Sequence, residues 1–151
     1  MRCKEIAGLK INTLFDSVGN IKEIAYLSAE QTKGSKGRKI IIGKKLQKSL
    51  SDYYKSQRLD KRPASRPLIP SQKGGHFRPN ALVQLFGKLY ADAGIEGASS
   101  HSGRRSLASS LAAKGTGVRV LQEILGHRSI ATTQKYIDVQ ESMLVSAVNL
   151  L

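Results

Sequence analysis

The segment Leu125-Gly-His-Arg-Ser-Ile-Ala-Thr-Thr-Gln-Lys-Tyr136 decides how the rest of this sequence is interpreted. It carries two reactive side chains, His127 and Tyr136, with eight residues between them. Gly126 and His127 close a helical run of apolar residues, and Ser129 is a suitable N-cap for a second helix. The segment therefore predicts a helix, a turn at His127, and a short helix that carries Tyr136.

Further cationic side chains lie upstream in three short clusters. Residues 101–104 read His-Ser-Gly-Arg, residues 2–5 read Arg-Cys-Lys-Glu, and Lys33 lies in a Gly-rich basic segment. Cations and hydrogen-bond donors around one hydroxyl suit a transition state rich in negatively charged oxygen, as in phosphoryl transfer. The phenol of Tyr136 is the candidate nucleophile for such a reaction.

Taken in order, these motifs closely resemble the catalytic domain of the tyrosine recombinase (phage integrase) family. That family carries Arg-x-x-Glu, a hairpin Lys, His-x-x-Arg, Leu-Gly-His and a Tyr in the same sequence, and the resemblance covers nearly the whole chain. It implies site-specific DNA recombination or integration, by strand cleavage and rejoining through a 3′-phosphotyrosyl intermediate. The catalytic residues that it implies are Arg2, Lys33, His101, Arg104, His127 and Tyr136.

The resemblance also implies a role for each of these side chains. The two arginines clamp the scissile phosphate, because a guanidinium donates two parallel hydrogen bonds and stays charged. His127 donates to a non-bridging phosphate oxygen, and His101 transfers a proton or contacts the phosphate. Lys33 protonates the departing 5′ oxygen, with Lys36 as the alternative. Neither a metal nor a nucleotide cofactor is expected, because the covalent link keeps the bond energy.

Periodicity and turn residues predict an α+β, mainly α domain with a small antiparallel sheet and about seven helices. The stretch from Arg62 to Gly75 contains three prolines and is expected to be a surface connection, with His76 as a surface loop residue. Leu89 and Leu107 are expected to face inward from their helices. The expected elements are helices at 2–10, 44–57, 79–93, after 101 and from 141, and strands at 21–32 and 38–42 around a hairpin loop.

The charge of the chain points to a polyanionic partner. The net charge is +14 and the sequence pI about 10.2. Between Gln31 and Arg62 there are eleven Lys or Arg against two acids, so much of the excess is on one segment. This favours binding to a nucleic acid over a merely solvated surface. The resemblance implies that this partner is double-stranded DNA, because a basic RNA-binding protein would explain the charge but not the ordered motifs.

Other sequence features indicate where in the cell the protein is located. The sequence has no apolar run of about 20 residues and no recognisable signal peptide, so no membrane association is expected. Three histidines and one cysteine at these spacings do not form a zinc site, and a single cysteine fits a reducing cytosol. The predicted location is cytoplasmic, for a bacterial or phage-encoded protein associated with the nucleoid.

Residues 1–151 are expected to form a single catalytic domain that lacks the family's first helices and its N-terminal DNA-binding domain. Two functions stay open at this level: an active recombinase, and a truncated, catalytically inactive DNA-binding integrase remnant. The apolar C-terminal helix, with Leu144, Val148 and Leu151, has two interpretations. It either packs on its own domain or couples neighbouring protomers in a tetramer on DNA.

Overall fold

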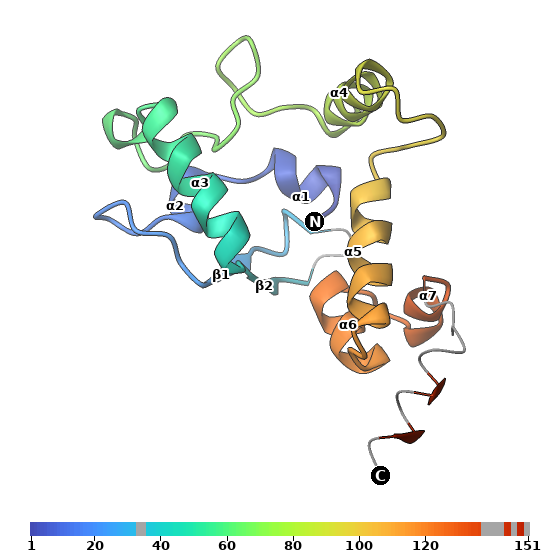
Figure 1. The fold of residues 1–151 in the computed structure, drawn as a ribbon. Coiled ribbons are helices and arrows are strands. Elements are labelled where there is room, and N and C mark those ends of the chain that lie inside the picture. Colours follow the sequence, from blue (N-terminus) through green and yellow to red (C-terminus); the bar gives the residue numbers. More distant parts are fainter. Residues whose placement is uncertain (33–35, 137–143, 146–147, 150–151) are drawn as a thin grey trace. The chain divides into compact units, whose positions relative to one another are not determined.

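The computed structural model describes residues 1–32, 36–136, 144–145 and 148–149 (Figure 1). The chain divides into two compact units, Met1–Ser100 and His101–Leu151. Within the described residues there are seven α-helices, one 3-10 helix and one two-stranded antiparallel sheet. The expected α+β, mainly α fold is confirmed.

The first unit contains four α-helices and the sheet. Helix α1 contacts α4, and α2 contacts strand β1. Pro79 is the first residue of α4, as expected, because proline has no N–H to lose at a helix start. The elements are α1 (Cys3–Ala7), α2 (Ile11–Leu14), β1 (Ile24–Leu27), β2 (Arg38–Ile41), α3 (Lys44–Ser56), η1 (Leu59–Lys61) and α4 (Pro79–Asp92).

The sheet is antiparallel as expected, but β1 is shorter than the predicted strand. Its register pairs Ile24 with Ile41 and Leu27 with Arg38. Strand β1 ends at Leu27 because the chain turns there: the Ser28 backbone N–H donates to Gln31 Oε1 over 2.9 Å. Burial alternates along β1, so only one face of this strand packs on the core.

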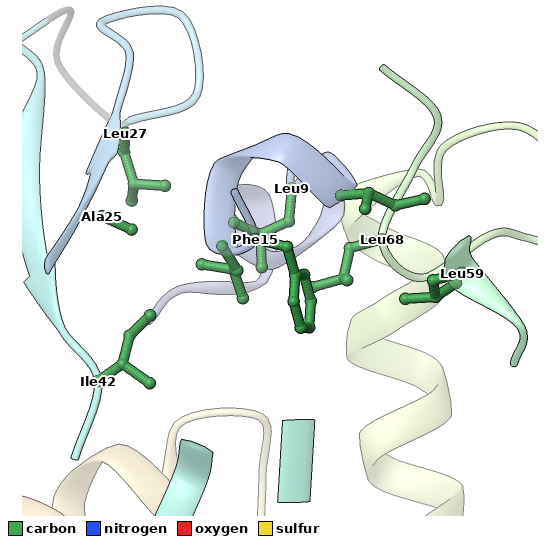
Figure 2. Packing of buried hydrophobic residues seen from close by; sticks show 9 residues of the cluster. Leu9, Phe15, Ala25, Leu27, Ile42, Leu59 and Leu68 are labelled. Carbon is green, nitrogen blue, oxygen red and sulfur yellow. The ribbon is translucent and has the colours of Figure 1, made fainter. Parts of the chain in front are cut away.

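The core of the first unit gathers apolar side chains from α2, the sheet, η1 and the proline-rich connection (Figure 2). Leu68, in that connection, is 2% exposed, and its N–H donates to the Leu9 carbonyl over 2.8 Å. Most of residues 62–75 are exposed or half-buried, as expected of a surface connection, but Pro67 and Leu68 are buried, which the prediction missed. Prolines hide the apolar signal here, because Pro67 and Pro70 break any strand or helix periodicity around Leu68.

The second unit consists of α5 (Ser102–Ala113), α6 (Val118–Leu125) and α7 (Ile130–Gln134). Helix α6 contacts both α5 and α7. The buried face of α5 is formed by Ala108 and Ala112, at 0% and 4% exposure. Leu107 is 47% exposed, and Leu89 in α4 is 53% exposed, so both inward predictions are wrong. Ala108 and Ala112 are four positions apart on α5 and therefore share one face of the helix, which is the buried face. Leu107 is next to Ala108 in sequence and therefore lies on a different face.

Among the described residues, no helix is long and apolar enough to cross a membrane. The predicted C-terminal helix lies largely outside the described residues, as does Lys33. Of the apolar residues in that segment, Leu144 and Val148 are described, and they are 56% and 68% exposed.

Candidate active site

The turn between α6 and α7 holds His127 in place through its own backbone. Gly126 has φ 62° and ψ 47°, a left-handed conformation that glycine adopts without strain. The His127 N–H donates to the Gln122 carbonyl and the Gly126 N–H to the Glu123 carbonyl, each over 3.1 Å. This pair of bonds is a Schellman ending, which satisfies carbonyls that the last helical turn leaves unpaired. The sequence prediction of a helix end at Gly126 is confirmed.

The side chain of His127 is held by a second residue of the same segment. His127 is 9% exposed, and its Nδ1 lies 2.9 Å from Oγ1 of Thr133, which has no exposed surface. Tyr136 follows α7, and its N–H donates to the Thr133 carbonyl over 3.0 Å. The rings of His127 and Tyr136 lie 5.7 Å apart, centroid to centroid. The structure therefore brings together the two residues from which the sequence interpretation began.

Tyr136 lies just beyond the short helix on which the sequence placed it. Helix α7 ends at Gln134, and Lys135 is its C-cap residue. The Ser109 hydroxyl, from α5, donates to the Tyr136 carbonyl over 3.3 Å. The backbone of Tyr136 is thus hydrogen-bonded to both α7 and α5, which fixes the position from which its side chain extends.

Arg104 and His101 occupy the first turn of α5. The Arg104 Nη2 group donates to the Leu125 carbonyl at the end of α6, and the side chain is 9% exposed. This bond brings the guanidinium to the same helix end that His127 follows. His101 is the N-cap residue of α5 and is exposed. The second unit thus contains His101, Arg104, His127 and Tyr136.

Gln122 and Thr133 are two buried residues of this region that the sequence analysis did not single out. Gln122 Nε2 donates to the His127 carbonyl over 3.0 Å, and Arg119 Nη1 donates to Gln122 Oε1 over 3.1 Å. Both residues were detectable as polar side chains on the apolar faces of α6 and α7. A single sequence gives no sign that their partner is His127.

Arg2, the other expected clamping arginine, lies in the first unit at the N-cap of α1. Its Nη1 is 3.6 Å from Glu5 Oε1, which confirms the expected Arg-x-x-Glu pair. The Arg2 backbone N–H also donates to Glu5 Oε2 over 2.6 Å. A third residue completes the cluster: Arg38 Nε donates to Glu5 Oε1 over 3.1 Å, and its Nη2 donates to Oε2 over 2.9 Å.

Glu5 is a fully buried carboxylate, at 0% exposure. Burial by itself raises the pKa of this carboxyl, but the hydrogen bonds from Arg38 and from the Arg2 backbone outweigh that effect. The net result is a pKa below the ordinary value of 4.5. Glu5 is therefore ionised at neutral pH, and it connects the helix that begins after Arg2 to strand β2.

Thr32 and Lys36, which flank residues 33–35 of the predicted hairpin loop, are joined to each other, and Thr32 is also joined to α1. Thr32 Oγ1 donates to the Lys36 carbonyl over 2.6 Å. Lys4 Nζ donates to the Thr32 carbonyl over 3.2 Å. These bonds and the Glu5–Arg38 pair hold the loop ends next to the helix of Arg2. Lys36 itself is exposed.

The remaining histidine, His76, is exposed and lies outside the helices and strands, as expected of a surface loop residue. Its Nδ1 also donates to the carbonyl of Ala7, the last residue of α1, over 2.8 Å. This contact to a helix end was not predicted. Among the described residues, no three His, Cys, Asp or Glu side chains lie close enough together to hold a metal ion.

Comparison with known proteins matches this arrangement of motifs to one family. The phage integrase family profile matches residues 1–143. The chain is 33% identical, over 131 residues, to a protein named tyrosine recombinase XerC from Methylobacterium nodulans, covering 86% of this chain and 39% of the relative. This chain belongs to the phage integrase family, the class of tyrosine recombinases.

Solved structures of recombinases share the fold of this chain. The crystal structure of XerA recombinase superimposes with a TM-score of 0.75 at 27% identity, over 99% of this chain and 51% of that one. XerH site-specific recombinase, solved bound to its palindromic difH substrate in a post-cleavage complex, gives a TM-score of 0.69 at 24% identity, over 98% of this chain and 41% of that one. The chain thus spans about half, or less, of the length of these proteins.

Proposed function

We propose that this chain is a tyrosine recombinase catalytic domain that cleaves and rejoins double-stranded DNA through Tyr136. The observation that carries the proposal is the pairing of His127 and Tyr136, whose rings lie 5.7 Å apart on a turn held by both backbone and side-chain hydrogen bonds. It is supported by membership of the phage integrase family.

In this proposal the phenolic oxygen of Tyr136 attacks the phosphorus of one phosphodiester and gives up its proton to the phosphate site, with His101 as a candidate acceptor. A Tyr–O–P bond forms and the bond from phosphorus to the 5′ oxygen breaks, which leaves a 3′-phosphotyrosyl link. The leaving oxygen takes a proton from Lys33, with Lys36 as the alternative donor. A 5′ hydroxyl from the same or a partner strand then attacks the link, which reseals the DNA and releases Tyr136.

The other four residues stabilise charge. Arg2 and Arg104 donate to the non-bridging phosphate oxygens, whose negative charge grows in the transition state. His127 donates to a non-bridging oxygen of the same phosphate, and His101 contacts the phosphate or transfers a proton. That residues 1–151 form one catalytic domain is part of this proposal.

Charge supports the DNA partner. The net charge is +14, and Lys44, Lys45, Lys48 and Lys55 on α3 are all exposed. Neutralising phosphates releases condensed counterions, so the DNA affinity should fall steeply with salt. Assembly of a tetramer on DNA, and a cytoplasmic location in association with the nucleoid, stay predictions.

A covalent-trapping assay tests the proposal. The protein is incubated with supercoiled plasmid and denatured, and protein-linked nicked DNA is compared between the wild type and Tyr136→Phe. We expect an adduct only with the wild type, while both proteins bind DNA with similar affinity. Tyr90→Phe, a partly buried tyrosine in α4 of the first unit, is the matched control and should keep the adduct.

Two outcomes would contradict the proposal. An adduct in Tyr136→Phe would show that another residue is the nucleophile. Salt-sensitive binding by both proteins without any adduct, even on a plasmid library that carries diverse recombination sites, would favour a DNA-binding protein that does not cleave.

A further inference from the structure

Thr133 is the residue that contacts the imidazole of His127 from the helix leading to Tyr136. Its Oγ1 lies 2.9 Å from His127 Nδ1. Thr133 has 0% exposure and His127 has 9%, so bulk water does not compete for this contact. A neutral imidazole carries its hydrogen on one ring nitrogen only, and the partner of one nitrogen determines the state of the other.

The direction of this hydrogen bond follows from the needs of the hydroxyl. Among the described residues, the contact with His127 is the only hydrogen bond that Thr133 Oγ1 makes. A hydroxyl has one hydrogen to donate, and a buried donor without an acceptor is costly. If Nδ1–H donated to Oγ1, the hydroxyl hydrogen would be buried with no acceptor. If Oγ1–H donates to Nδ1, both groups are satisfied.

We propose that Thr133 is a positioning residue that sets the tautomer of His127. Its hydroxyl donates to Nδ1, so the hydrogen of the neutral imidazole is on Nε2. His127 then presents an N–H donor at Nε2, at the far side of the ring from Thr133. The tautomer itself does not depend on the proposed function; the use of this N–H toward a phosphate oxygen does rest on it.

The turn geometry strengthens this assignment. The backbone of His127 is held on both sides, by its N–H donating to the Gln122 carbonyl and by its carbonyl accepting from Gln122 Nε2. With the backbone fixed, ring rotation is the remaining freedom of the side chain, and the bond to Thr133 opposes it. Thr133 also accepts the Tyr136 N–H at its carbonyl. One residue therefore positions both the imidazole and the tyrosine.

Nuclear magnetic resonance of the histidine ring nitrogens tests the tautomer without any DNA. The ¹⁵N-labelled chain is studied at rising pH, from about 6.5 upward, until the ring-nitrogen signals stop moving and the rings are shown to be neutral. Of the three histidines, His127 is assigned by the signals lost in His127→Gln. We expect an unprotonated Nδ1 and a protonated Nε2. A proton on Nδ1 in the wild type would overturn the proposal.

Variants test whether Thr133 sets this state. Thr133→Val replaces the hydroxyl with a methyl group of similar size, and we expect the two nitrogen signals of His127 to move toward each other as both tautomers become populated. Thr133→Ser should restore the wild-type pattern. Thr132→Val, at the neighbouring exposed position, should leave it unchanged. An unchanged His127 pattern in folded Thr133→Val would overturn the proposal.

A second measurement needs no variant. A buried hydroxyl hydrogen bonded to Nδ1 exchanges slowly, so it should give its own proton signal with a nuclear Overhauser effect to the His127 ring. Its detection supports the proposal even if Thr133→Val fails to fold. A Thr133 hydroxyl that exchanges with water as fast as that of Thr132 would count against it.

The trapping assay connects the tautomer to catalysis. We expect Thr133→Val to slow adduct formation by about three- to tenfold, the worth of one net hydrogen bond, with unchanged DNA affinity. Thr133→Ser should cleave at close to the wild-type rate. If the wild type itself gives no adduct, the proposed function fails, and the ring-nitrogen signals still decide the tautomer.

Discussion

Glu5 and Arg38 form a doubly hydrogen-bonded ion pair whose carboxylate has no exposed surface. The two bonds, of 3.1 and 2.9 Å, join helix α1 to strand β2 across 33 residues of sequence. Arg38 is itself only 15% exposed at its side chain. Because the same carboxylate accepts the Arg2 N–H, the pair also fixes the start of the helix that follows a proposed phosphate-binding arginine.

Removing Arg38 should destabilise the fold strongly. Arg38→Ala leaves the Glu5 carboxylate buried without its main partner, and breaking such a pair costs about 3 kcal/mol or more. We expect a loss of that size in the free energy of unfolding, measured by urea titration. Lys39→Ala, at the next and exposed position of β2, is the control and should change it by less than about 0.5 kcal/mol. Equal effects of the two substitutions would contradict the role of the pair.

The same carboxylate should make stability depend on pH. The pKa of Glu5 in the folded protein lies below its ordinary value of 4.5, because hydrogen bonds from Arg38 and Arg2 outweigh the effect of burial. Its stabilising effect is therefore complete above about pH 4.5 and is lost as pH falls through the lower, folded pKa. We expect the stability advantage of the wild type over Glu5→Gln to shrink below that pH.

The measurement is urea unfolding of both proteins from pH 7 to pH 3. Asp16, whose pKa is also lowered, by hydrogen bonds headed by that from the Asn20 backbone, is present in both proteins and cancels in the difference. A constant difference over this range would show that Glu5 is not the titrating group.

Any side chain at position 126 should destabilise the protein. Its φ of 62° costs an L-residue about 1 kcal/mol or more, so Gly126→Ala should lower the free energy of unfolding by that amount and slow the cleavage that depends on His127. Gly87→Ala is the opposite case. Gly87 is exposed in the interior of α4, and open space surrounds the position that an alanine methyl group would take, so alanine there should stabilise by about 0.5–1 kcal/mol. Thermal melts of both variants check the opposite signs.

The rate of DNA cleavage should depend on the planar guanidinium group of Arg104 and not only on its positive charge. Arg104→Lys keeps the positive charge but loses the planar fork, and we expect adduct formation to slow by about 10²–10³, as for loss of a transition-state donor. Arg105→Lys, at the adjacent exposed position, should cleave at nearly the wild-type rate. Quenched time courses of covalent adduct on plasmid DNA compare the two. Similar rates for both would remove Arg104 from the catalytic set.

Leu68 should behave as a core residue in spite of its proline-rich surroundings. Leu68→Ala removes a fully buried side chain, and we expect a loss of about 2–5 kcal/mol in the free energy of unfolding. Leu46, at 51% exposure in α3, is the control, and its alanine variant should lose much less. Urea titration distinguishes the two, and a small effect at Leu68 would show that the connection is not part of the core.

The sequence by itself determined the helices whose caps are local and the residues that identify the family. Pro79 begins α4 and Gly126 ends α6, each because one residue has a special backbone requirement, and Ser129 is the N-cap residue of α7. His127 and Tyr136 could be paired from sequence because only a short turn and one helix separate them. An interaction can be predicted from the sequence when the interacting groups are close neighbours along the chain.

The tertiary structure decided which polar groups are buried together. Glu5 meets Arg38 across the hairpin, Arg104 meets the Leu125 carbonyl, and Leu68 enters a core that its prolines conceal. Each of these contacts joins segments far apart in the sequence, and a lone glutamate or arginine has the same appearance in a sequence whether it is paired or solvated. Burial, which makes such pairs strong, exists only once the chain has folded.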